Sequence, residues 1–256
     1  MKIALIQFDT VWENINLNIQ TLSSKINQLE SDVDLVVLPE MFSTGFTMSP
    51  KTIAENENGK AVQWMVETAK SQNVAITGSL VISENEKFYN RLFFVFPDGS
   101  YKTYNKKHLF SLAGEEKVYE PGNDKLIVNY KGWNICPLIC YDLRFPVYSR
   151  IVDQAYDLLI YVASWPDQRI YAWDTLLKAR AIENMSFVVA VNRSGEDDFK
   201  NNYSGHSQVI DYMGQYIQEP IIDKQTIVVA LEKSGLEKAR SRFAFLDDAD
   251  SFLLTK

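Results

Sequence analysis

The chain has 256 residues, of which 46% are hydrophobic and 23% charged, and its formal net charge is −7 at pH 7. These fractions are typical of a folded globular protein and exclude a disordered, collagen-like or coiled-coil chain. The acidic balance argues against a general nucleic-acid binder, which needs a basic surface for phosphate groups. No window reaches the roughly 18 apolar residues of a membrane span, and the short apolar N-terminal run ends at Asp9, unlike a signal peptide. We therefore predict a cytoplasmic protein with no membrane segment.

The N-terminal half alternates strands with helices. Apolar runs predict strands, and apolar residues at steps of three and four predict amphipathic helices. The order strand, helix, strand is typical of parallel crossovers. These elements are strands at 3–8, 34–38, 74–82 and 87–96, helices at 15–29 and 59–72, a hairpin turn at 97–99 and a loop at 111–122.

The C-terminal half repeats this pattern. No proline- or serine-rich linker divides the chain, so we predict a single domain with a catalytic core at about 2–231 and a C-terminal helix and tail at 232–256. Two halves of strands and helices fit a sandwich of two sheets with helices outside. The predicted elements of the C-terminal half are a hairpin of 126–130 and 133–140, a helix from Pro146 to near Ala155, a strand at 157–163, a helix at 168–185, a strand at 186–192, strands at 204–212 and 225–231 joined through Met213 and Gly214, and a helix at 233–245.

Three side chains that can carry chemistry stand at strand ends, where functional groups of α/β folds gather. Glu40 follows the 34–38 strand, Lys106 follows the return strand of the hairpin, and Cys140 ends the 133–140 strand. A thiol is nucleophilic as its thiolate, and a carboxylate can take its proton. A lysine can favour the thiolate and then stabilise a developing oxyanion. Together, these three residues therefore predict an enzyme that catalyses acyl transfer.

Each of these side chains also has an ordinary structural explanation. A carboxylate after a strand can cap a helix, a lysine can be solvated as well as its neighbour Lys107, and a cysteine in an apolar run can be inert core. Cys136 is the natural comparison for Cys140. On a strand the two would stand about 13 Å apart at roughly 3.3 Å per residue, beyond the roughly 7 Å that a disulfide allows, so we predict no disulfide.

Several segments together favour the catalytic interpretation, because the chain resembles the nitrilase superfamily of carbon–nitrogen hydrolases, and in particular its omega-amidase branch. The resemblance runs from about residue 2 to residue 231. The segments that carry it are 38–46 (LPEMFSTGF), 106–110 (KKHLF), 140–146 (CYDLRFP), 161–166 (YVASWP) and 179–184 (ARAIEN).

The resemblance implies a four-layer α-β-β-α sandwich and a homodimer joined through helices outside the sheets. It implies Glu40 as general base, Lys106 as oxyanion stabiliser and Cys140 as nucleophile. It also implies a second glutamate in the loop before the nucleophile strand. Counting back from the Pro-Gly pair at 121–122 places this glutamate at Glu115, with Glu116 as the alternative. Neither a metal nor an organic cofactor is implied.

The pair Tyr141-Asp142 after the nucleophile resembles the amidase branches, whereas the nitrile-cleaving branch carries Trp-Glu there. We therefore predict an omega-amidase that cleaves the terminal amide of a small dicarboxylic acid monoamide, such as 2-oxoglutaramate or 2-oxosuccinamate, through a cysteine thioester. The expected partner is this small-molecule amide. The alternatives are hydrolysis of an N-carbamoyl amine or an aliphatic amide, a nitrilase, or a binding protein that kept the fold and lost activity.

The substrate's distal carboxylate needs a cationic recess, for which Arg91, Arg169 and Arg193 are the candidates. Asp142 and Arg144 are expected to orient the nucleophile turn rather than contact substrate.

The predicted substrate-binding residues are Tyr141, through its backbone N–H, Phe42, Phe46, Trp165 and Arg169. For the aromatic side chains of Phe42, Phe46 and Trp165, packing in the core remains the alternative.

Overall fold

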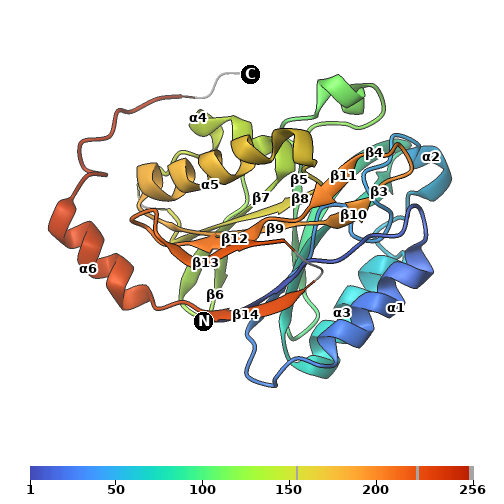
Figure 1. Ribbon diagram of the computed structural model, residues 1–256, viewed down its shortest axis with the longest axis horizontal. Helices are drawn as coiled ribbons and strands as arrows, with labels where there is room; N and C mark the ends of the chain where they lie inside the picture. The colour runs from blue at the N-terminus through green and yellow to red at the C-terminus, as the bar shows by residue number, and fades with distance from the viewer. Residues whose placement is uncertain (154, 223–224, 254–256) are drawn as a thin grey trace.

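Two six-stranded sheets form the centre of the protein (Figure 1). The computed structural model describes residues 1–153, 155–222 and 225–253. From edge to edge, the first sheet contains β14 (Thr226–Ala230), β1 (Lys2–Ile6), β2 (Leu35–Val37), β3 (Ala75–Glu84), β4 (Lys87–Val95) and β5 (Tyr101–Asn105). The second contains β13 (Tyr216–Ile221), β12 (Ser207–Ile210), β9 (Phe187–Asn192), β8 (Leu158–Ala163), β7 (Trp133–Ile139) and β6 (Val128–Tyr130).

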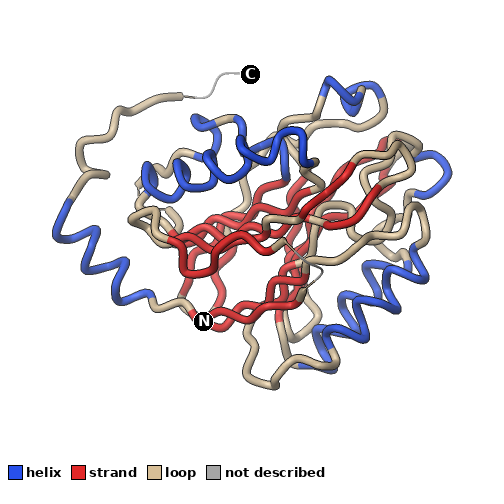
Figure 2. The backbone as a smooth tube through the Cα atoms, viewed as in Figure 1, coloured by secondary structure: helices blue, strands red, loops and turns tan. Residues whose placement is uncertain are grey.

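Helices cover the outer face of each sheet (Figure 2), so the predicted four-layer α-β-β-α sandwich is confirmed. Helices α1 (Ile15–Ile26) and α3 (Lys60–Gln72) lie on the first sheet, and α5 (Ile170–Asn184) lies on the second. Successive side chains of a strand point to opposite faces of its sheet, so the two faces of the first sheet contribute to two separate hydrophobic cores. Ile3 and Leu5 of β1 pack toward the second sheet, whereas Ala4 and Ile6 pack toward α1 and α3.

The helix α1 illustrates why the sequence folds this way. The Asn14 side chain accepts a hydrogen bond from the Leu17 N–H and so caps the first turn. Ile19, Leu22 and Ile26 recur on one face and are buried against the first sheet. Burial of each such side chain contributes roughly 1.5–3 kcal/mol.

Parallel pairing aligns the ends of the strands that precede the candidate residues. β2 runs parallel to β1 and β3, as the predicted crossover requires, and β8 runs parallel to β7 and β9. Glu40 follows β2, and Cys140 directly follows β7. The two sheets therefore bring these residues to the same end of the sandwich, where Lys106 also follows β5.

The helix predicted from Pro146 to near Ala155 is much shorter, because α4 spans only Pro146–Ser149. Arg150 has an extended backbone, and the Ile151 N–H donates to the Asn184 side chain at the end of α5. Burial of Ile151 against the core thus ends the helix. Residue 154 of the predicted helix lies outside the described residues.

The prediction that Met213 and Gly214 join strands 204–212 and 225–231 is wrong. That turn leads into β13, which pairs antiparallel with β12, while β14 crosses to the first sheet and pairs antiparallel with β1. β13 is an edge strand with the mixed sequence YIQEPI. Its polar residues and Pro220 fit an edge position but hide the strand from an apolar-run search.

Smaller elements complete the chain. The predicted C-terminal helix ends two residues early. It packs at the periphery of the molecule (Figure 1), where Leu236 is buried in the core and Arg240 donates to the backbone oxygens of Met185 and Tyr156. Residues 254–256 of the predicted tail lie outside the described residues. The smaller elements are the helices α2 (Pro50–Ile53) and α6 (Lys233–Phe243) and a hairpin of β10 (Ser194–Glu196) and β11 (Asn202–Ser204). The sequence did not predict the hairpin.

Candidate active site

Two carboxylates and one lysine form a fully buried cluster between the sheets. The Lys106 Nζ lies 2.8 Å from Glu40 Oε1 and 3.0 and 2.9 Å from the two carboxylate oxygens of Glu115. All three side chains are inaccessible to solvent. Burial alone would lower the pKa of Lys106, but the charges of Glu115 and Glu40 raise it above its usual value. The lysine is therefore a fixed cation.

Glu115 and its neighbour Glu116 lie in very different surroundings. Both belong to a short 3-10 turn at Glu115–Lys117, within the predicted loop. Glu115 is buried, and its Oε2 also accepts a 2.6 Å hydrogen bond from the Phe110 N–H, whereas Glu116 is exposed. Burial raises the pKa of the Glu115 carboxyl, while Lys106 opposes that rise. The structure thus places Glu115, and not Glu116, beside Lys106.

Cys140 begins the turn Cys140–Arg144 at the end of β7 and adopts φ +42°. This left-handed backbone is strained for a residue other than glycine, at a cost of about 1–3 kcal/mol. It turns the chain sharply, so that the cysteine lines a pocket. Burial and the nearby Glu40 carboxylate raise the pKa of the Cys140 thiol, although Lys106 lowers it. The resting side chain is a neutral thiol next to a proton acceptor.

Cys136 lies on the same strand, but its surroundings differ. It is fully buried in the core between the sheets, and burial raises its pKa to about 12. Both cysteines are free, as predicted.

The carboxylate of Asp142 holds the turn that carries Cys140. Its Oδ2 accepts hydrogen bonds from the Tyr104 hydroxyl at 2.7 Å and the Ile139 N–H at 3.0 Å. Its Oδ1 accepts the His108 N–H at 3.0 Å and lies 2.8 Å from His108 Nδ1. Asp142 therefore ties the segment after Lys106 to the turn at Cys140.

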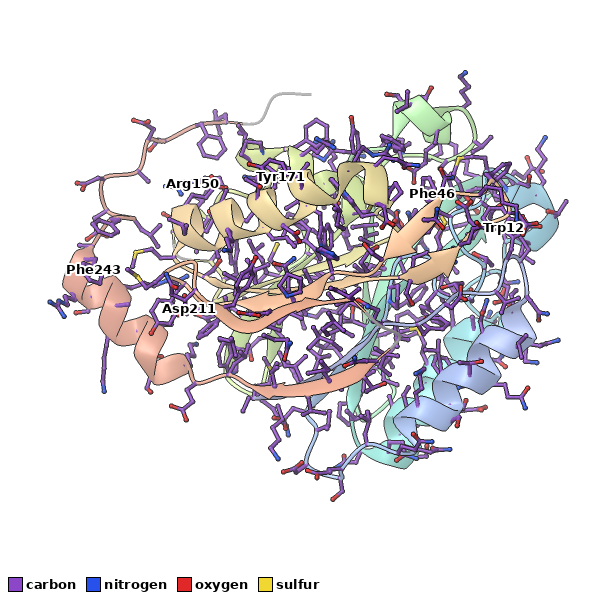
Figure 3. The ribbon with its side chains drawn as sticks, viewed as in Figure 1. Trp12, Phe46, Arg150, Tyr171, Asp211 and Phe243 are labelled. Atoms are coloured by element: carbon purple, nitrogen blue, oxygen red, sulfur yellow. The ribbon has the colours of Figure 1, made fainter. Side chains whose placement is uncertain are left out.

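A cavity of about 330 Å³ opens above Cys140 and Lys106. This is within the usual size range of small-molecule sites. The Lys106 Nζ lies 5.1 Å from the ring centre of Phe46, which Figure 3 shows near α2 and the β10–β11 hairpin. The predicted substrate-binding residues that line the cavity are Tyr141, Phe46, Trp165 and Arg169.

Phe42 does not line this cavity, and we correct its assignment. Its side chain is fully buried in the core between the first sheet and helices α1 and α3, where its ring lies 5.8 Å from that of Trp64. The positive φ of Met41, +45°, turns the chain just after Glu40. Glu40 and Phe42 therefore belong to different sides of the sheet.

The three candidate arginines, Arg91, Arg169 and Arg193, lie in different surroundings. Arg91 is buried in ion pairs with Glu57 and Glu84, and Arg193 donates to the carbonyl oxygens of Thr10 and Glu196. Only Arg169 of these three lines the cavity, and Arg144, expected to orient the turn, lines it too. Arg91 and Arg193 are accordingly structural cations of the scaffold.

Neither a metal cluster nor a membrane helix is present in the part of the chain that the structure describes. Within it, no three His, Cys, Asp or Glu side chains are grouped so as to hold a metal ion. None of its helices combines the length and apolar character needed to cross a membrane.

Comparison with known proteins identifies the family. The sequence model of the carbon–nitrogen hydrolase family matches residues 2–241. The chain belongs to the carbon–nitrogen hydrolase family. It is therefore a hydrolase of carbon–nitrogen bonds other than peptide bonds.

Several relatives of this hydrolase match along nearly the whole chain. It is 39% identical to the omega-amidase YafV of Yersinia enterocolitica, with 99% of this chain and 98% of the relative covered. It is 31% identical to the 2-oxoglutaramate amidase of Bacillus subtilis, with 96% of each covered. A CN-hydrolase superfamily protein from Xanthomonas campestris, whose crystal structure has an arsenic adduct in the active site, superposes with a TM-score of 0.97 at 39% identity, over 100% of this chain and 99% of that one.

The hydrolase site also contains residues that the sequence did not single out for it. The Ser164 N–H donates to Glu40 Oε2 at 2.8 Å, and the Asn90 Nδ2 donates to Glu40 Oε1 at 2.8 Å. Their signal was weak, since Ser164 is one letter of a longer motif and Asn90 lies inside a strand. The unpredicted β10–β11 hairpin adds cavity residues, namely Asp197, Phe199, Asn201 and Tyr203.

Proposed function

We propose that this carbon–nitrogen hydrolase is an omega-amidase. It converts the terminal amide of a small dicarboxylic acid monoamide, such as 2-oxoglutaramate or 2-oxosuccinamate, to the dicarboxylate and ammonia. The names of the relatives at 39% and 31% identity support this activity. The observation that carries it is a pair of arginines in the cavity wall that have no acidic partner among the described residues.

Arg144 and Arg169 are the two arginines of the cavity wall. The Arg144 guanidinium carbon lies 4.9 Å from the ring centre of Trp165, and that of Arg169 lies 5.1 Å from the ring centre of Phe110. Among the described residues, neither guanidinium group makes an ion pair or a hydrogen bond. Stacking fixes each planar group and leaves its edge N–H groups for a carboxylate. A substrate with a distal carboxylate supplies the missing anion.

The first half of the reaction forms a thioester. Glu40 takes the proton of Cys140 as the sulfur attacks the amide carbonyl carbon. Lys106 and the backbone N–H of Tyr141 stabilise the resulting oxyanion, and each such donor contributes on the order of 3–4 kcal/mol. Ammonia then leaves with the proton from Glu40. Glu115 keeps the lysine in place through its two contacts with Nζ.

The second half regenerates the enzyme. Glu40 accepts a proton from water, whose oxygen attacks the thioester carbonyl. The carbon–sulfur bond breaks, the dicarboxylate leaves, and Cys140 regains its proton from Glu40. No other proton acceptor is required, because the same carboxylate takes and returns one proton in each half.

An ammonia-release screen tests the proposed function. The test substrates are 2-oxoglutaramate, succinamate, butyramide, an N-carbamoyl amine and an aliphatic nitrile. Succinamate and butyramide match in length, but only succinamate carries a distal carboxylate. We expect the acidic amides to be cleaved at least about tenfold more efficiently than butyramide. Preference for butyramide, the carbamoyl amine or the nitrile would reject the omega-amidase assignment in favour of that substrate.

We further propose that the enzyme is a cytoplasmic homodimer joined through the helices outside the second sheet. Exposed apolar side chains on α5 support such a contact, since Tyr171, labelled in Figure 3, is 81% exposed and Ile182 is 54% exposed. Light scattering across a concentration series tests the dimer, and replacing Tyr171 and Ile182 by lysine should shift it toward monomer. Cell fractionation tests the location.

A further inference from the structure

Asn90 links all three members of the buried cluster from the middle of β4. Its side-chain Nδ2 donates to Glu40 Oε1 at 2.8 Å and to Glu115 Oε1 at 3.3 Å. Its backbone oxygen accepts the Lys106 N–H at 2.9 Å. The residue is completely buried, so no water replaces these contacts at its surface.

The orientation of this amide group is set by charge. The other amide atom, Oδ1, is buried and has no hydrogen-bond partner among the described residues. Rotating the group by 180° would place this carbonyl oxygen against two carboxylates, and an oxygen cannot donate a hydrogen bond. A buried polar atom without a partner is unfavourable. The unpartnered Oδ1 atom is therefore tolerated because this orientation lets the NH₂ group donate to Glu40 and Glu115.

We infer that Asn90 is a positioning residue that holds the Oε1 atoms of both carboxylates by hydrogen bonds and leaves Glu40 Oε2 as the proton acceptor for Cys140. Glu40 Oε1 accepts from both Lys106 and Asn90, so its lone pairs are occupied. Within the described residues, the N–H group that donates to Glu40 Oε2 is that of Ser164. One lone pair of Oε2 is therefore free for the thiol proton. This inference rests on the proposed role of Glu40 as the base.

The effect of Asn90 on protonation has a definite sign. A donor to the ionised form of a carboxyl lowers its pKa. Burial already raises the pKa of Glu115, and the Glu40 charge raises it further. Loss of the Asn90 donor should raise the pKa of Glu115 further, so reaction of Cys140 should be lost at a higher pH on the acidic side of its pH profile. The titratable groups facing the pair are Lys106, Cys140 and Tyr119.

The experiment measures alkylation of Cys140 by iodoacetamide across pH in the full-length protein, with the modified residue identified by mass spectrometry. This reaction needs the base and the thiol but no amide substrate, so it remains informative if the omega-amidase proposal fails. Asn90→Leu removes the donor and keeps the branched shape of the side chain. Loss of two charge-assisted hydrogen bonds should move the acidic limb of the pH–rate profile, where alkylation is lost on acidification, upward by about one pH unit or more. Asn90→Asp adds a negative charge and should move the limb further.

Asn184→Leu is the matched control, since Asn184 is a buried asparagine whose contacts are with Arg180 and Ile151. It should lower thermal stability and leave the limb in place. A folded Asn90→Leu protein with the wild-type limb and a uniformly lower rate would overturn the inference and leave only a packing role. If Asn90→Leu does not fold, a wild-type limb in Asn90→Asp would overturn it equally.

Discussion

The floor and the wall of the active-site cavity handle charge in opposite ways. At the floor, Glu40, Lys106 and Glu115 are excluded from solvent and paired with one another. In the wall, Arg144 and Arg169 are partly exposed and stacked on aromatic rings. The floor is complete before any substrate arrives, as preorganised stabilisation of a developing oxyanion, the role we propose for it, requires. The wall is completed only by an anion that the substrate brings.

This comparison separates two kinds of variant. A change at the floor should lower kcat for every amide, because the floor acts on the reacting atoms. A change in the wall should raise KM for acidic amides alone. An uncharged amide such as butyramide therefore distinguishes the two regions in one assay.

The largest effect is expected at the nucleophile. Cys140→Ala removes the sulfur that we propose forms the thioester, so amide hydrolysis should be abolished while the circular dichroism spectrum and melting curve remain native-like. Cys136→Ala should keep most activity and lose stability, since Cys136 is packed in the core. An inactive Cys136→Ala protein beside an active Cys140→Ala protein would reverse the assignment.

Glu40→Gln should have the next largest effect. The amide keeps the shape of the side chain but cannot accept the thiol proton, and general acid–base groups contribute typically about 10²–10⁴-fold. We expect kcat to fall by at least this range for both succinamate and butyramide. Wild-type turnover would exclude Glu40 as the base.

Lys106→Met removes the cation that faces Cys140 and one oxyanion donor. Loss of the donor alone should cost roughly 10²–10³-fold in kcat. Because Lys106 lowers the pKa of Cys140, alkylation at neutral pH should also slow. Lys107 is the matched control, since it is adjacent and only partly buried.

Lys107→Met should change neither rate by more than a small factor. Equal losses in the two methionine variants would show that a diffuse positive potential, and not one buried lysine, supports the reaction. Parallel kcat and alkylation measurements on both proteins decide between these outcomes.

The sequence predicted the floor better than the wall. Apolar runs locate β2 and β7 to within a few residues, and Glu40 and Cys140 follow from where those runs end. The wall depends on contacts between distant segments. Arg144 lies four residues beyond Cys140, but only the fold shows that the intervening 3-10 turn brings its side chain to the cavity.

Three particular errors have the same physical origin. The aromatic character of Phe42 predicts a pocket residue, with core packing as the alternative, and the turn at Met41 places its side chain in the core on the helix side of the sheet. The β10–β11 hairpin was missed because its strands have three residues each, too few for a periodic pattern. Asn90 was missed because its partners lie 50 and 25 residues away. Local sequence patterns do not encode such tertiary contacts.

The smallest effect is expected in the wall. Arg169→Met and Arg144→Met each remove one cation and keep much of the apolar stem over the aromatic ring. A hydrogen bond to a charged group contributes about 1.5–3 kcal/mol, so kcat/KM for succinamate should fall roughly 10–100-fold, mainly through KM. Hydrolysis of butyramide should stay within about twofold in both variants. If one variant loses succinamate and the other does not, that single arginine binds the carboxylate. A matching loss with butyramide would instead mean that the arginines support the floor, and the separation of the two regions would fail.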